Sequence, residues 1–362
     1  MTKKLLYLTD RQATWLELFF DLIFVVALGK VTHFLVHVHH GHLSDGIWWK
    51  FVLIFIPLWW IWVGHTVYSN RFDADTRSHR VTTLFLMSLL ILLSVVVNED
   101  IKNNYKTFVV IYGIARFFIA GMYFSAARKY PDKAGFASKV GLFFTIGALI
   151  SMSSVLFEPV VALFVFYNGI LFDICSPVLF RRYINAIPAD REHLVERVGL
   201  LAIILLGESI ISMANGISNV TWDMSTIITA GFGFSFVCMI WWIYFDSFVF
   251  LIESKFDVNG IAILYSQLLT YMSFAILANM IGHAIKNDLN IDEFRILAIS
   301  GMILLYCGKQ TAYIVNVPEY RYYNVRNTIA VLTVAGLSLL LATPQYILMG
   351  MCVSLAVYIG MN

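Results

Sequence analysis

The first apolar stretch of the chain, WLELFFDLIFVVALGKV, contains two carboxylates, Glu17 and Asp21. The stretch is long enough to cross a bilayer, and an ionisable side chain inside such a span is costly enough to indicate a functional site. Residues four apart share one face of a helix, so the two acids would repel each other. A cation, a proton or a water-filled cavity must relieve that repulsion. The pair therefore points to a pathway for a proton, an ion or a substrate.

Asp21 is the more constrained of the two acids. It lies one helical turn deeper than Glu17, and its short side chain cannot reach the membrane surface as a long one can. Its neighbours in the sequence are phenylalanine, leucine and isoleucine, which offer no hydrogen bonds. We therefore expect Asp21 to face the protein interior or water.

Several other apolar segments also contain ionisable side chains. Acids and bases at similar depths could neutralise one another inside a helix bundle, and Arg116 and Lys309 are the candidate counter-charges for the acids. Buried ion pairs that merely orient helices are the alternative interpretation. The candidates for a substrate or ion pathway are Glu17, Asp21, His65, Arg116, Asp173, Glu208, Asp246 and Lys309.

The composition identifies the elements that must position these residues. Apolar residues make up 59% of the 362 residues and charged residues only 13%, with a net charge of +2. Soluble domains usually carry about 25% charged residues, so we expect an all-α, polytopic integral membrane protein whose partner is the lipid bilayer, not nucleic acid. Twelve apolar runs are predicted to be transmembrane helices, at residues 14–36, 48–69, 81–97, 107–127, 137–156, 160–180, 197–215, 224–252, 260–284, 294–314, 327–343 and 345–361.

The distribution of positive charge predicts the orientation of these helices. Lysine and arginine lie mostly in the N-terminal tail and in the connections that follow the even-numbered runs. Cytoplasmic connections are enriched in these two residues, so both termini are expected on the cytoplasmic side. The last two runs are short and are separated only by Pro344, so a partly inserted hairpin is an alternative for them.

A sparse internal repeat divides the chain. WWIW at 59–62 precedes RFD at 71–73, and WWIY at 241–244 precedes KFD at 255–257. Each copy falls in the second helix of six, so we predict two parallel six-helix repeats, residues 1–188 and 189–362, within one membrane domain.

Motifs for metals, nucleotides and hydrolysis are weak or missing. In HFLVHVHHGH, His33 and His37 have a helical spacing that could suit zinc or copper, but no carboxylate or cysteine completes a known pattern. The chain has no Walker A loop, GxSxG, HExxH or CxxC. We therefore expect no metal and no cofactor, and we do not expect ATP-driven transport by this chain alone.

Four segments resemble one known family. ELFFDLIFVVAL (17–28), WWIWVGHTVYSNRFDADTRSHR (59–80), HLVERVGLLAIILLGES (193–209) and WWIYFD (241–246) are similar to bacterial low temperature requirement A (LtrA) proteins. The resemblance implies a multi-pass protein of the bacterial inner membrane that is linked to growth in the cold, and it implies no particular substrate. Val195 stands where the family pattern HLPER has proline.

The resemblance also implies which residues matter. Arg71, Asp73, His193, Glu196 and Arg197 would form a motif in the cytoplasmic loops. The complete set of motif residues is Glu17, Asp21, Arg71, Asp73, His193, Glu196, Arg197, Gly207, Glu208 and Asp246.

Three functions fit these patterns. The leading hypothesis is a secondary transporter of an unknown small solute, in which the solute or a coupling proton engages Glu17, Asp21 and Glu208. An ion channel or pore is the second, because Glu17 to Phe24 is weakly similar to the first-helix motif of a six-helix potassium channel family, with Phe20 in place of its serine. The third is a membrane enzyme or lipid-handling protein acting at the cytoplasmic face.

Overall fold

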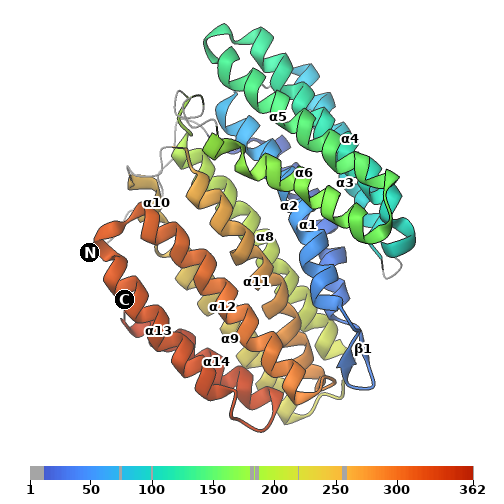
Figure 1. Ribbon diagram of the computed structural model, residues 1–362. Helices are drawn as coiled ribbons and strands as arrows, with labels where there is room; N and C mark the ends of the chain where they lie inside the picture. Colours follow the sequence, from blue (N-terminus) through green and yellow to red (C-terminus); the bar gives the residue numbers. More distant parts are fainter. Residues whose placement is uncertain are drawn as a thin grey trace. The chain divides into compact units, whose positions relative to one another are not determined.

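Long apolar segments must satisfy their backbone hydrogen bonds internally in lipid, which a helix does within one segment. The computed structural model describes residues 12–72, 76–98, 101–179, 183, 187–218, 220–254 and 259–361, and these are almost entirely helical (Figure 1). Each of the twelve predicted runs coincides with a helix of at least 18 residues. These helices are α1 (Trp15–Thr32), α2 (Ile47–Arg71), α3 (Arg77–Val96), α4 (Ile101–Lys129), α5 (Ala134–Ser153), α6 (Pro159–Leu179), α8 (Arg191–Ser218), α9 (Met224–Phe245), α11 (Ile261–Lys286), α12 (Ile291–Asn316), α13 (Arg321–Ser338) and α14 (Pro344–Met361).

The remaining elements are short. One six-residue helix, α10 (Phe248–Glu253), continues the run predicted at 224–252 after a break beyond Phe245. In the described part of the chain, three 3-10 turns join longer helices, at Pro131–Lys133, Ser154–Leu156 and Pro318–Tyr320, and a fourth, His33–Leu35, follows α1. Within the described residues, nine helices are long and apolar enough to cross a membrane by length and composition. The prediction of a helical, multi-pass membrane protein is confirmed.

The chain divides into two compact units. Unit 1 comprises residues 1–31, 53–197 and 258–260. Within it, α3 packs on α4, α4 on α5 and α5 on α6, and these helices run side by side (Figure 1). Glu17 and Asp21 both lie in this unit.

Unit 2 comprises residues 32–52, 198–257 and 261–362. Its most extensive helix pair is α11 with α12, while α14 packs on both α9 and α13. Nearly all of α11 between Ile263 and Ile285 is buried, so this helix forms the core of the unit. The predicted six-helix repeat stays a prediction. Trp59 and Trp60 of the first copy are buried, whereas the matching Trp241 and Trp242 of the second are about half exposed, at 50% and 57%.

The histidine-rich segment folds into a small hairpin in unit 2. Strands β1 (Val38–His39) and β2 (His42–Leu43) pair antiparallel around His40 and Gly41. Both turn residues have positive φ, 52° and 85°, which matches the twist of a two-residue hairpin and favours glycine at the second position. Glu293 of α12 holds the hairpin by accepting hydrogen bonds from the Leu43 backbone N–H at 2.7 Å and from the His42 ring at 2.8 Å.

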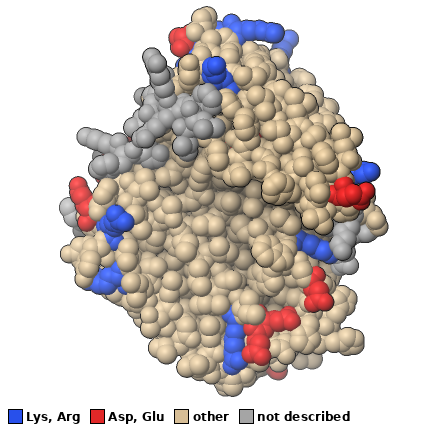
Figure 2. All heavy atoms as spheres, in the orientation of Figure 1, with Lys and Arg blue, Asp and Glu red and all other residues tan. Residues whose placement is uncertain are grey.

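Large apolar side chains cover much of the outer surface. On α6, Val160 is 83% exposed and Phe164 is 72% exposed. On the face shown in Figure 2, charged side chains are few and lie toward its edges. Such a surface is unfavourable in water and is the one expected against lipid tails.

Candidate functional site

Two helices present matching pairs of polar residues to each other in unit 1. Glu17 and Asp21 lie one turn apart on α1, and His193 and Arg197 lie one turn apart on the first two turns of α8. All four side chains are buried, with Asp21, His193 and Arg197 fully enclosed. We call these four residues the carboxylate–arginine cluster.

Arg197 holds both acids. Its Nη1 donates to Glu17 Oε1 at 2.9 Å, its Nη2 donates to Asp21 Oδ1 at 2.6 Å, and its Nε donates to Asp21 Oδ2 at 3.1 Å. The two bonds to Asp21 form the bidentate fork that a planar guanidinium makes with a carboxylate. Charge-assisted bonds of this kind offset part of the cost of taking the charges out of water.

Neighbouring groups complete the hydrogen bonding of the acids. Trp62 of α2 donates its indole N–H to Asp21 Oδ1 at 2.8 Å. Thr14 donates its backbone N–H and its hydroxyl to Glu17 Oε2, at 2.8 and 3.0 Å. The His193 Nε2 lies 3.4 Å from the same Glu17 oxygen. Asn70 Nδ2 lies 3.2 Å from His193 Nδ1, which favours the tautomer whose Nε2 carries the proton and faces Glu17.

The charges of this cluster do not balance. Two carboxylates share one guanidinium, so the cluster carries one excess negative charge whenever His193 is neutral. A buried net charge is unfavourable, and a proton on His193 or on a carboxylate, or a bound cation, would remove it. The arrangement can therefore take up and release a proton.

Comparison with known proteins places the chain in a family. The family described as bacterial low temperature requirement A protein (LtrA) matches residues 12–361, nearly the whole chain. The chain belongs to the LtrA family. It is also similar to a protein of Rhizobium meliloti (strain 1021), at 28% identity over 324 residues that cover 83% of this chain and 77% of the relative. That relative is described as uncharacterized, so the comparison supplies no substrate.

The cluster corrects two expectations about this LtrA protein. Arg197, not Arg116 or Lys309, is the counter-charge of Glu17 and Asp21. His193, Glu196 and Arg197 lie on α8, not in a loop, because this helix begins at Arg191. The early start has a local cause, since Asp190 Oδ1 accepts the His193 N–H at 3.1 Å as a helix cap. Asp190 ahead of the apolar run was the signal in the sequence that could have shown it.

The start of α8 is also fixed from another helix. Asn70 of α2 donates its amide to the Asp190 carbonyl at 2.7 Å and accepts the Asp190 N–H at 3.1 Å.

Two other residues of the expected loop motif bond to groups outside the carboxylate–arginine cluster. Glu196 accepts the Ala13 N–H at 3.0 Å, and Arg71, the last residue of α2, donates to the Asn259 carbonyl at 3.0 Å. Asp73 lies outside the described residues.

A second buried ion pair in unit 1 joins two further candidates. Arg116 of α4 donates to Asp173 Oδ2 of α6 at 2.6 Å, and Trp60 donates to the same oxygen at 3.4 Å. The guanidinium also lies 3.9 Å from the centre of the Phe144 ring. Here one acid meets one base, so the charges balance, which is the composition expected of a pair that orients helices.

His65 lies next to the cluster on α2. Its ring is fully buried and stacks on Phe20 with centroids 4.0 Å apart, on the stretch of α1 between the two acids. Its Nε2 is 3.5 Å from the Thr83 hydroxyl, and its ring lies 6.3 Å from that of His79. A line of rings therefore runs from His79 on α3 to α1.

The remaining candidates belong to unit 2. Glu208 on α8 is partly buried and Asp246, at the end of α9, is exposed, and neither forms an ion pair within the described part of the chain. Lys309 of α12 is buried, donates to the Tyr358 hydroxyl at 3.1 Å and lies 4.4 Å from the Tyr313 ring centre. No carboxylate pairs with it among the residues described.

The histidines considered for metal binding do not form a larger group. The rings of His33 and His37 are stacked with centroids 4.6 Å apart, and both side chains are exposed. Among the described residues, no three histidine, cysteine or acidic side chains are gathered in a way that could hold a metal ion.

Proposed function

We propose that this LtrA protein is a secondary transporter of a small solute that uses the carboxylate–arginine cluster to couple transport to proton movement. The observation that carries the proposal is the excess of one carboxylate over one guanidinium in a buried cluster on membrane helices. Chains of aspartate, glutamate and histidine inside membrane spans form the proton relays of pumps and transporters.

The depths of the two acids support a direction for the proton. Glu17 is bonded to Thr14, an exposed residue at the start of α1, so this acid lies close to the surface end of the helix. Asp21 lies one turn deeper and is fully enclosed. Arg197 contacts both acids. A proton arriving at Glu17 therefore weakens the hydrogen bond between Arg197 and Glu17, and it leaves the bidentate bonds between Arg197 and Asp21 in place. Glu17 would thus exchange protons first and Asp21 would follow.

The second ion pair of unit 1 provides an internal comparison. Arg116 and Asp173 are as deeply buried as the cluster, but their charges already cancel. A pair of that kind needs no proton to become neutral, so we assign it to helix packing. The difference in stoichiometry is what separates the proposed functional cluster from the structural pair.

The test uses the purified full chain in proteoliposomes that contain a pH-sensitive dye. A potassium gradient with valinomycin drives proton entry while amino acids, sugars, nucleosides and organic acids are added in turn as probes. At least one probe class should cause saturable proton influx, and Asp21→Asn should abolish it. Asp132→Asn removes an exposed carboxylate of the same unit and serves as the matched control.

Two outcomes would overturn the proposal. Equal influx in Asp21→Asn and wild type would remove the cluster from the mechanism. Proton or cation conductance that needs no solute and shows unitary currents in planar bilayers would establish the channel alternative.

The membrane location and the orientation of the chain form a second part of the proposal. We also propose a bacterial inner-membrane location with both termini in the cytoplasm, supported by the positive charge that follows the even-numbered helices. Two parallel six-helix halves, with a boundary near residue 188, remain part of this proposal.

A further inference from the structure

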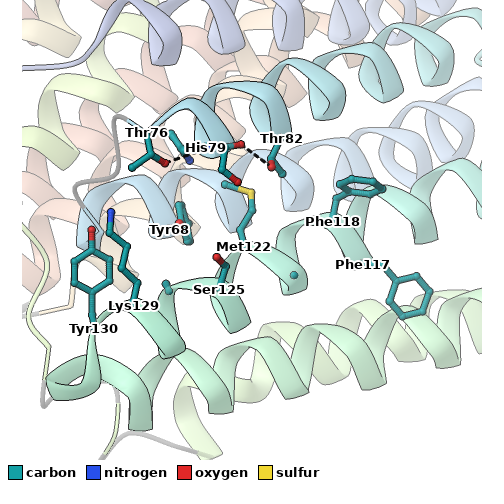
Figure 3. Close-up of a pocket in the computed structure, with 13 residues that line it drawn as sticks. Tyr68, Thr76, His79, Thr82, Phe117, Phe118, Met122, Ser125, Lys129 and Tyr130 are labelled. Carbon is teal, nitrogen blue, oxygen red and sulfur yellow. Dashed lines mark hydrogen bonds between the residues drawn. The ribbon is translucent and has the colours of Figure 1, made fainter.

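A pocket of about 380 Å³ lies in unit 1 between the end of α2, the start of α3 and the second half of α4. It is separate from the carboxylate–arginine cluster and shares no residue with it. We call this cavity the α3–α4 pocket, and its lining includes Tyr68, His79, Phe118, Met122, Ser125 and Lys129 (Figure 3).

The pocket is polar at one end and apolar at the other. In Figure 3, Lys129 and Tyr130 lie at one end, while Phe117 and Phe118 lie at the opposite end. Phe117 and Lys129 are twelve residues apart on α4, which corresponds to about 18 Å along a helix. The site therefore fits an elongated molecule with a polar head and an apolar body.

The polar end favours a negative charge. Lys129 and His79 line it, and no carboxylate is among the described residues that line the pocket. It also adjoins the N-terminus of α3, where the Thr76 hydroxyl caps the His79 N–H at 3.2 Å and where the helix dipole favours anions. Lys129 and the N-terminus of α3 would thus each attract an anionic group.

The apolar end favours a lipid over a soluble anion. Phe118 is 37% exposed and packs in a tilted arrangement against Phe85 of α3 with centroids 4.4 Å apart, on the outer surface of this helix pair. A free phosphate ion would use the polar end alone and leave the apolar end of the pocket unfilled. A phospholipid would occupy both ends at once.

We propose that the α3–α4 pocket binds an anionic phospholipid, with its headgroup between Lys129 and the start of α3 and an acyl chain along Met122 and Phe118. Basic pockets between membrane helices are a known way to recognise anionic headgroups, and one lysine near the surface contributes about 1 kcal/mol.

The experiment measures lipid retention by native mass spectrometry of the delipidated full chain. Phosphatidylglycerol, phosphatidylcholine and inorganic phosphate are added separately to wild type, Lys129→Gln and Arg128→Gln. Arg128 is the matched control, because it is a neighbouring exposed basic residue in the last turn of α4 and does not line the pocket. Lys129→Gln should lower phosphatidylglycerol retention about fivefold, and Arg128→Gln should leave it unchanged.

A third variant tests the apolar end. Met122→Trp fills the pocket and should lower retention of phosphatidylglycerol while size-exclusion profiles confirm a folded protein. Equal losses in Lys129→Gln and Arg128→Gln would show only a surface charge effect and overturn the proposal. Displacement of the lipid by millimolar phosphate, with no effect of Met122→Trp, would show a soluble-anion site instead. No flux is measured, so the result does not depend on the transporter proposal.

Discussion

At the scale of single residues, Arg197 decides the electrostatics of unit 1. Its guanidinium makes three hydrogen bonds to two acids, and nothing else in the cluster carries a permanent positive charge. Removing one partner of a buried ion pair is much more damaging than removing both, because an uncompensated charge stays behind.

Arg197→Met should therefore destabilise the protein by about 3–5 kcal/mol, since it leaves two buried carboxylates facing each other. The measurement is thermal unfolding in detergent, with exposed Arg128→Met as the control. Adding Asp21→Asn to Arg197→Met should restore part of the loss, because it removes one of the stranded charges. An Arg197→Met protein as stable as wild type would contradict the assignment.

Lys309 in unit 2 is a buried positive charge that no carboxylate pairs with among the described residues. Its ammonium is buried against the Tyr358 hydroxyl and the Tyr313 ring, which offset only part of its lost hydration. Lys309→Met, similar in length but uncharged, should raise the midpoint of thermal unfolding by a few degrees. Arg321→Met, at an exposed residue of the same unit, should leave it unchanged. A lower midpoint for Lys309→Met would mean that the ammonium has a favourable partner.

At the scale of elements, close helix contacts position the charged groups. Gly64 of α2 allows Arg116 of α4 to approach, because a Cβ atom there would lie 2.8 Å from Arg116 Nη1. Gly147 of α5 leaves room for the Asp173 carboxylate in the same way. Small residues of this kind let membrane helices pack closely.

Gly64→Ala should weaken the contact between α2 and α4 and lower stability by about 1–3 kcal/mol through overpacking. Gly231→Ala is the control, because a Cβ atom at that helical position meets nothing within 4 Å. Both variants would be compared by thermal unfolding in the same detergent. An unchanged midpoint for Gly64→Ala would show that Arg116 can move aside without loss.

The cap of α9 predicts a dependence on pH. Asp223 Oδ1 accepts the Thr226 backbone N–H at 2.7 Å, and this bond lowers the pKa of the Asp223 carboxyl below its ordinary value of 3.8. A lowered pKa means that the carboxylate stabilises the folded state in full above its ordinary pKa, and that this contribution is lost as the pH falls through the lowered value.

Asp223→Ala should therefore reduce the unfolding midpoint at pH 7, and its difference from wild type should shrink as the pH falls below about 4. Thermal unfolding at pH 7, 5 and 3 measures this. A difference that stays constant across the three values would show that the cap does not act through its charge.

At the scale of the whole molecule, two features indicate a chain that crosses the membrane many times. They are the exposed apolar side chains and the spacing of the connections that are rich in lysine and arginine. An even number of crossings places both termini on one side. Split fluorescent-protein tags at either end should therefore both be complemented by a fragment expressed in the cytoplasm. Complementation at one end alone would require an odd number of crossings and would exclude one of the twelve proposed spans.

The sequence by itself determined the helices and the interior position of Asp21. Hydropathy specifies the spans because lipid allows so few backbone arrangements. Asp21 is enclosed because its apolar neighbours in the sequence offer no hydrogen bonds, so its short side chain must find partners inside the protein. The same reasoning could not select Arg197. Its run of polar neighbours resembles a loop, and the residues Arg116 and Lys309 look equally suitable by depth.

Only the tertiary structure decided that pairing. Asn70 and Asp190 start α8 early enough to place Arg197 on a helix, and its guanidinium then lies beside both acids, over 170 residues away in the chain. Arg116 instead meets Asp173, where Gly64 and Gly147 leave room. Hydropathy records which residues enter the membrane, whereas the partners of buried charges depend on which helix faces come together, and that is set by packing.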